Sequence, residues 1–338
     1  MNVKSLSKRI CLVTGLCLCV TAFGGCGDSS DNSKTTTNTE TTTAAEASGI
    51  SNTNAITVTD TFADQTIVDE SLQKEAANGY TLENPFVVVN PYGTSPLTAV
   101  VIFSTEDETT GTITVKGKTE KDDVTGTIPA ARDHIVPIYG LYDGATTQVV
   151  IELSDGSSNT IDVTTEDSKL LSTIGEIETE MLDESAYDYS CLTFAMSCTG
   201  SVYALDSSGD IRWYYAAGGA LGMHQLSNGH LMLPTQYTLK TSYYKSGLQE
   251  IDLTGKVYRE YAIPGGMHHD FQELSNGNLL VASDSQDLTK VEDHVVEIDA
   301  KTGEVVWELN MADLLDTEDG RSASMTTDGS EEVDWYHN

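Results

Sequence analysis

The chain has 338 residues and a formal net charge of −34, from 18 basic and 52 acidic residues. A surface this acidic repels nucleic acid and anionic lipid, so the composition argues against a partner of either kind bound through charge. The length allows two domains with flexible segments besides them.

Residues 1–25 have the pattern of an export signal. A basic segment, residues 4–9, precedes an apolar run, residues 10–23, that is too short to cross a bilayer as a mature helix. The run ends in AFGGC, which resembles the lipobox of bacterial lipoproteins although Phe23 stands where Leu is usual. That resemblance implies acylation of Cys26. We therefore expect an extracytoplasmic protein that meets the cell membrane only through its lipid, with a secreted or periplasmic location as the alternative.

Residues 26–55 are rich in Ser and Thr and contain almost nothing to bury, so they predict a disordered tether. Beyond Cys26 the chain has two cysteines, Cys191 and Cys198. In an oxidising compartment they could form a local disulfide, and two buried thiols are the alternative.

Residues 56–165 contain short alternating segments separated by Gly, Pro and Asp turns, at roughly ten-residue spacing. This spacing predicts an antiparallel β-sandwich, and no cluster of chemically active side chains marks it. The expected strands are residues 86–89, 97–103, 111–115, 134–138, 148–153 and 160–163. Residues 166–189 then change period, and apolar side chains at three- and four-residue steps predict a linker helix.

Residues 190–338 repeat a strand, turn, strand pattern. Asp206, Asp252 and Asp299 recur about every 46 residues, close to the ~45-residue period of a propeller blade. Asn228-Gly229 and Asn276-Gly277 predict tight hairpins between them. The aspartates are expected to brace turns. About three blades fit, so the fold class is all-β: an N-terminal sandwich followed by an incomplete β-propeller.

Two histidine motifs stand out from this acidic chain. The first is His268-His269-Asp270, and the second is DWYHN at residues 334–338. Both fall where one blade should meet the next, which is where propellers build a central site. Strand alternation should send His268 and His269 to opposite faces, so that only one of them faces the axis. His224 and His230, beside the first hairpin, are interpreted as ordinary blade residues.

Residues 60–338 resemble the bacterial aryl-sulfate sulfotransferases that need no nucleotide sulfate donor. The resemblance lies in NPYGTSPLTAVVIFST, VKGK, VPIYGLY, SGDIRWYY, MHHDFQELSNGNLL and DWYHN. It implies a six-bladed propeller that moves a sulfuryl group from a phenolic sulfate ester to a phenol through a sulfated histidine. No cofactor and no metal are expected, since phenoxide is a good leaving group.

The resemblance also implies the site residues. His268, His269 and His337 would be catalytic, with Asp270, Trp335, Tyr336 and Asn338 around the substrate, although Trp335 would also suit blade packing. The sulfated histidine of the family is expected beyond residue 338, which makes independent turnover doubtful and suggests completion by association, as in a homo-oligomer. The alternatives are a non-catalytic, lipid-anchored propeller fragment, or a quinoprotein-like binding module suggested by EIDAKTGEVVWEL.

Overall fold

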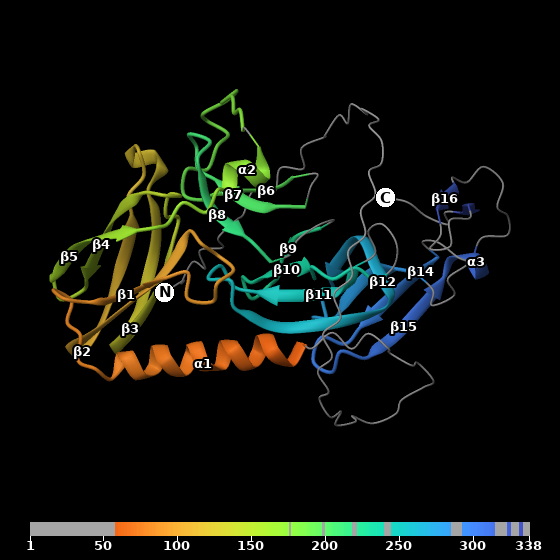
Figure 1. Cartoon of the computed structure of the whole chain (residues 1–338), viewed down its shortest axis with the longest axis horizontal. Coiled ribbons are helices and arrows are strands. Elements are labelled where there is room, and N and C mark those ends of the chain that lie inside the picture. The colour runs from red at the N-terminus through yellow and green to blue at the C-terminus, as the bar shows by residue number, and fades with distance from the viewer. Residues whose placement is uncertain are drawn as a thin grey trace, which may run out of the picture.

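The computed structural model describes residues 58–175, 177–197, 200–217, 222–239, 245–284, 293–314, 323–325 and 331–333. Figure 1 shows a β-sheet domain followed by further sheets that curl around one another, with a long helix along one side of both. The predicted all-β class, with an N-terminal β domain and an incomplete propeller, is confirmed. The predicted signal and tether lie outside the described residues.

The N-terminal domain is one five-stranded antiparallel sheet that folds over its own core. Its strands are β1 (Phe86–Val89), β2 (Thr98–Val115), β3 (Val124–Tyr139), β4 (Thr146–Leu153) and β5 (Ser158–Thr164), with a short 3-10 turn at Glu120–Asp122.

Strand β2 explains the fold-over. The two strands expected at residues 97–103 and 111–115 are its two halves, and β3 pairs with both. Register shifts between Ser104 and Gly111 bend it, so its first half pairs with β1 and its second half with β4. Side chains from both halves, such as Phe103 and Ile113, therefore meet in one buried cluster.

Helix α1 (Val58–Ala76) was not predicted. It contacts β2 and β3 of the N-terminal domain and β12 of the propeller (Figure 1). Leu72 packs on Val100 and Ile102, and the Gln65 side-chain oxygen accepts the Val257 backbone N–H at 2.8 Å. Among the described residues no helix is both long enough and apolar enough to cross a membrane.

The predicted linker helix is wrong for most of its length. Only α2 (Leu170–Ile174) is helical, and the described residues from 177 to 192 belong to no helix or strand. Lys169 before the helix and Gly175 after it both have positive φ, 57° and 91°. A left-handed residue at each end restricts this helix to little more than one turn, despite the favourable apolar spacing.

The propeller region contains a three-stranded and a seven-stranded antiparallel sheet. The first consists of β6 (Thr193–Met196), β7 (Val202–Leu205) and β8 (Ile211–Tyr215). The second runs in chain order from β9 to β15: β9 (His224–Gln225), β10 (Leu231–Pro234), β11 (Lys245–Ile251), β12 (Val257–Glu273), β13 (Leu279–Ser283), β14 (His294–Ile298) and β15 (Val305–Asn310). A short helix α3 (Met311–Leu314) and the hairpin β16 (Ala323–Met325) and β17 (Glu331–Val333) follow.

The turns agree with the repeat. The Asp252 carboxylate accepts the backbone N–H of Thr254 at 2.8 Å, and that of Asp299 accepts two backbone N–H groups at 2.9 Å. Gly229 and Gly277 have φ of 90° and 85° at the tips of their hairpins. The predictions of Asp-braced turns and Asn-Gly hairpins are therefore confirmed.

Strand β12 belongs to two blades. Its first part pairs with β11 and its last part with β13, so it forms the outer strand of one blade and the inner strand of the next. Gly265 and Gly266 lie at the crossing with φ of 77° and 90°, a conformation that residues with a side chain avoid. The segment that follows them carries the histidine pair.

Candidate functional site

The His268-His269-Asp270 segment lies where β12 becomes an inner strand. Its pairing with β13 is irregular between Met267 and Phe271, and His269 has a φ of 53°. Bulges and left-handed backbone at non-glycine residues are concentrated at functional sites. The backbone itself therefore marks this segment as a candidate.

The bulge brings the two imidazole rings together. Their centroids lie 5.7 Å apart and the rings are nearly perpendicular, at 86°. Regular alternation would have placed them on opposite faces, and the bulge departs from that alternation; which of the two faces the propeller axis stays a prediction. His268 is buried, with 1% of its surface exposed, whereas His269 is partly accessible.

A third histidine joins the segment from the neighbouring blade. His224, on the inner strand β9, places Nε2 3.1 Å from Oδ1 of Asp270. Its ring also meets Phe271 edge-on at 4.8 Å between centroids. From the sequence, His224 was interpreted as an ordinary blade residue. Its position just before an Asn-Gly hairpin, where His268-His269-Asp270 also lies, is the sequence signal that indicates a place in the site.

Gly222 allows this contact between blades. A Cβ at this position would lie 3.0 Å from the His269 carbonyl oxygen and 2.8 Å from a ring carbon of Phe271. Both distances are too short for a side chain, so the two inner strands approach this closely only because residue 222 is glycine.

The same end of the third blade contains buried acids. Met267, Ser283 and His294 are in register across β12, β13 and β14, and in the next row Asp284 lies opposite Gly266, whose carbonyl oxygen accepts the Asp284 backbone N–H at 3.3 Å. Asp284 and Asp293 are 2% and 0% exposed. His294 bridges Asp293 and Glu308, at 3.0 and 2.9 Å. Asp284 therefore lies beside the glycine pair that precedes the histidine segment.

Lys245 is a cationic group beside the segment. It pairs across the sheet with Met267, the residue before the histidines. Burial lowers the pKa of its ammonium group, whose nitrogen lies 3.4 Å from the Gln236 carbonyl oxygen. Lys245 therefore begins β11 across the sheet from the residue that precedes the histidine pair, and its ammonium group lies toward Gln236.

Several predicted site residues cannot be placed. Trp335, Tyr336, His337 and Asn338 lie outside the described residues, as does Cys26. Cys191 is described, and its Sγ lies 3.3 Å from the Asp188 carbonyl oxygen. Because its suggested partner Cys198 is also outside the described residues, the disulfide stays a prediction.

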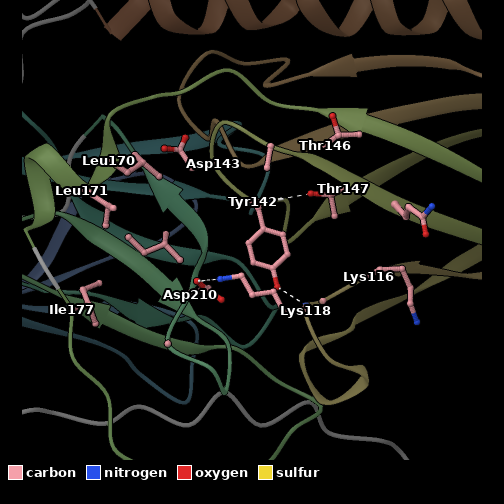
Figure 2. Close-up of a pocket in the computed structure, with 15 residues that line it drawn as sticks. Lys116, Lys118, Tyr142, Asp143, Thr146, Thr147, Leu170, Leu171, Ile177 and Asp210 are labelled. Carbon is pink, nitrogen blue, oxygen red and sulfur yellow. Dashed lines mark hydrogen bonds and ion pairs between the residues drawn. The ribbon is translucent and has the colours of Figure 1, made fainter.

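A separate cavity of about 1090 Å³ lies between the N-terminal domain and the first blade (Figure 2). The Lys118 ammonium pairs with Asp210 at 2.8 Å, and Lys116 pairs with Asp123. Burial raises the pKa of Tyr142 to about 12. The hydroxyl oxygen of Tyr142 accepts the backbone N–H of Lys118 at 2.9 Å. Both of its cations have carboxylate partners, so this cavity has a structural explanation in the contact between the two domains. Within the described ranges no three side chains form a metal-binding group.

The comparisons with known proteins agree with the division of the chain into an N-terminal β domain and a propeller region. Residues 178–338 match the family model described as Arylsulfotransferase (ASST), and residues 86–169 match the Arylsulfotransferase Ig-like domain. No curated protein matches the chain. Among solved structures it is similar to a dihydro-heme d1 dehydrogenase, NirN, in complex with DHE, at 13% identity and a TM-score of 0.23. That match covers 73% of this chain and 51% of the other, so the chain spans about half the length of that structure.

Proposed function

Because this chain belongs to the arylsulfotransferase family, we propose that it transfers a sulfuryl group from a phenolic sulfate ester to a phenolic acceptor. One observation carries the proposal. Within the stretch that matches the family, an irregular inner strand brings His268 and His269 to within 5.7 Å of each other.

The residue types suit this chemistry. Sulfuryl transfer, like phosphoryl transfer, depends mainly on positioning and on stabilising the charge of the equatorial oxygens. Imidazole N–H groups can donate to those oxygens, and a protonated imidazole can also supply a proton to a leaving phenoxide near neutral pH. In a chain with a net charge of −34, an anionic ester needs such a local group of donors.

We extend the proposal to a two-step exchange through a sulfated histidine, with His337 as a further site residue and Trp335, Tyr336 and Asn338 beside the aryl ring. The support is the resemblance of DWYHN and of the His268-His269-Asp270 segment to the motifs of the family.

Incubation of the chain with 4-nitrophenyl sulfate and phenol, without a nucleotide sulfate donor, tests the function. Release of 4-nitrophenol that depends on phenol is the expected result. His268→Gln, His269→Gln and His337→Gln should each lower it by about 100-fold or more, whereas His134→Gln in the N-terminal domain should not. Transfer that survives all three changes would show that the site is elsewhere.

We also propose that the protein is anchored outside the cytoplasm by a lipid on Cys26, as its lipobox-like sequence suggests. Metabolic labelling with an alkyne fatty acid provides the test. The unaltered chain should incorporate the label and fractionate with membranes, and Cys26→Ser should lose both properties. A soluble, unlabelled wild-type protein would favour plain secretion.

A further inference from the structure

We propose that His224 accepts the proton of the phenolic acceptor and that Asp270 is its positioning residue, an inference that rests on the proposed function. His224 lies on β9 and Asp270 on β12, the inner strands of adjacent blades. The contact between them is therefore made only when the two blades pack together.

The geometry of the pair fixes which nitrogen can act. His224 Nε2 is 3.1 Å from Asp270 Oδ1. An ionised carboxylate can only accept a hydrogen bond, so Nε2 of the neutral ring carries the hydrogen and Nδ1 has the lone pair. This is the base-and-orienter arrangement of nucleophile-activating sites. The His224 and Asp270 side chains are 37% and 61% exposed, so a phenol could reach the ring.

The neighbouring strands leave Asp270 as the charged partner of the ring. On β10 the residue opposite His224 is Met232, and this strand, Leu231–Pro234, carries no charge. On β12 the charged residues in this stretch are Asp270 and Glu273. The Glu273 carboxylate accepts the Ser227 N–H at 2.7 Å and its hydroxyl at 2.8 Å. The negative charge that faces the imidazole is therefore that of Asp270.

In the accepting half of the exchange the phenol O–H bond breaks, and its proton passes to Nδ1 of His224 while the phenol oxygen forms the new S–O bond. The bond between sulfur and the histidine that carries the sulfuryl group breaks, and its electron pair stays on that nitrogen. In the donating half the leaving phenoxide takes the proton from the His224 imidazolium. Each cycle consumes one aryl sulfate and one phenol and forms one of each.

The test compares acceptors that differ in ionisation. Phenol, with a pKa of about 10 like that of tyrosine, must lose its proton during transfer, whereas pentafluorophenol is already ionised at neutral pH. We expect His224→Gln to slow acceptor-dependent turnover with phenol by about 100-fold or more. The same change should slow turnover with pentafluorophenol far less. Asp270→Asn should likewise slow turnover with phenol far more than turnover with pentafluorophenol, because an amide can also donate to Nε2 and so no longer fixes which ring nitrogen carries the hydrogen.

His230→Gln is the matched control. His230 lies on the same hairpin and also contacts a carboxylate, Glu250 Oε1 at 2.7 Å, but within its own blade. His230→Gln should leave turnover with both acceptors unchanged. Equal losses with both acceptors, in His224→Gln or in Asp270→Asn, would overturn the inference while transfer by the wild-type chain still supported the proposed function. Absence of turnover by the wild-type chain would overturn both.

Discussion

Arg212 and Asp206 form an ion pair that is almost completely withdrawn from solvent. Arg212 Nη1 lies 2.9 Å from Asp206 Oδ2, and their side chains are 0% and 2% exposed. Both residues belong to the first blade, but the guanidinium also donates to the carbonyl oxygens of Gly140 and Asp122, at 2.8 and 2.7 Å, in the N-terminal domain. The Tyr142 ring covers its face at 4.1 Å. The pair therefore joins the two domains into one packed unit.

We expect Arg212→Met to lower the free energy of unfolding by about 3–5 kcal/mol, because it leaves the Asp206 carboxylate buried and unpaired. Urea unfolding followed by circular dichroism measures this loss. Arg132→Met is the control, because the ion pair of Arg132 with Asp107, at 3.3 Å, is exposed to solvent. Loss of this surface pair should change the free energy of unfolding by no more than about 0.5 kcal/mol. Similar losses in both variants would show that burial of Arg212 does not matter.

Asp122 supplies a second contact between the domains, and this one depends on pH. Burial favours its neutral form, but hydrogen bonds from Ser207, Thr119 and Ser208 outweigh burial and lower the pKa of Asp122 below its ordinary value. Ser207 and Ser208 belong to the first blade and donate at 2.6 and 2.9 Å. The ionised carboxylate therefore stabilises the folded state.

Since the folded-state pKa of Asp122 is the lower one, its stabilisation is complete above the unfolded pKa of about 3.9 and is lost as the pH falls through the folded value. Asp122→Asn should cost about 1–3 kcal/mol at pH 7, and the difference from wild type should narrow below about pH 4. Urea midpoints across this range measure it, with the neighbouring Glu120→Gln as control. A difference that stays constant with pH would contradict the assignment.

The sequence predicted the blades and the histidine segment because both depend on local signals. Gly229 and Gly277 take the positive φ of a hairpin, and Asp252 and Asp299 cap their turns, whatever the rest of the chain does. Helix α1 escaped prediction because its apolar residues do not mark its buried face. Ile67 is 65% exposed whereas Gln65 is only 7% exposed.

The His224–Asp270 contact could not be predicted, because it depends on the stagger between blades. The two Asn-Gly hairpins are 48 residues apart, from 228 to 276, so the repeat aligns His224 with Gln272. The bonded residues are 46 apart, as are Ser227 and Glu273. Adjacent inner strands are therefore offset by two residues. That offset follows from the packing of one blade against the next, which no single repeat contains.

Gly222 tests that packing. In Gly222→Ala the new methyl group would lie 2.8 Å from Phe271 and 3.0 Å from the His269 carbonyl oxygen, so the two inner strands must move apart. A displacement of about 1 Å can lower turnover by about 100-fold, and we expect a loss of that order in 4-nitrophenyl sulfate assays. Gly126→Ala is the matched control, because its methyl group meets only the Ile113 side chain, at 3.2 Å. Full activity in Gly222→Ala would show that the spacing between the blades is not critical.

Two substitutions at His269 distinguish the role of its backbone conformation from the role of its imidazole ring. Its φ of 53° is accessible to asparagine but costs a β-branched residue about 1–2 kcal/mol or more. We expect His269→Asn to unfold near the wild-type midpoint and His269→Val to be less stable by that amount, as measured by urea unfolding. Both variants lack the imidazole, so both should lose transfer. If His269→Asn instead retains transfer while His269→Val does not, this residue serves the site through the bulge that it forms, and His268 must supply the ring.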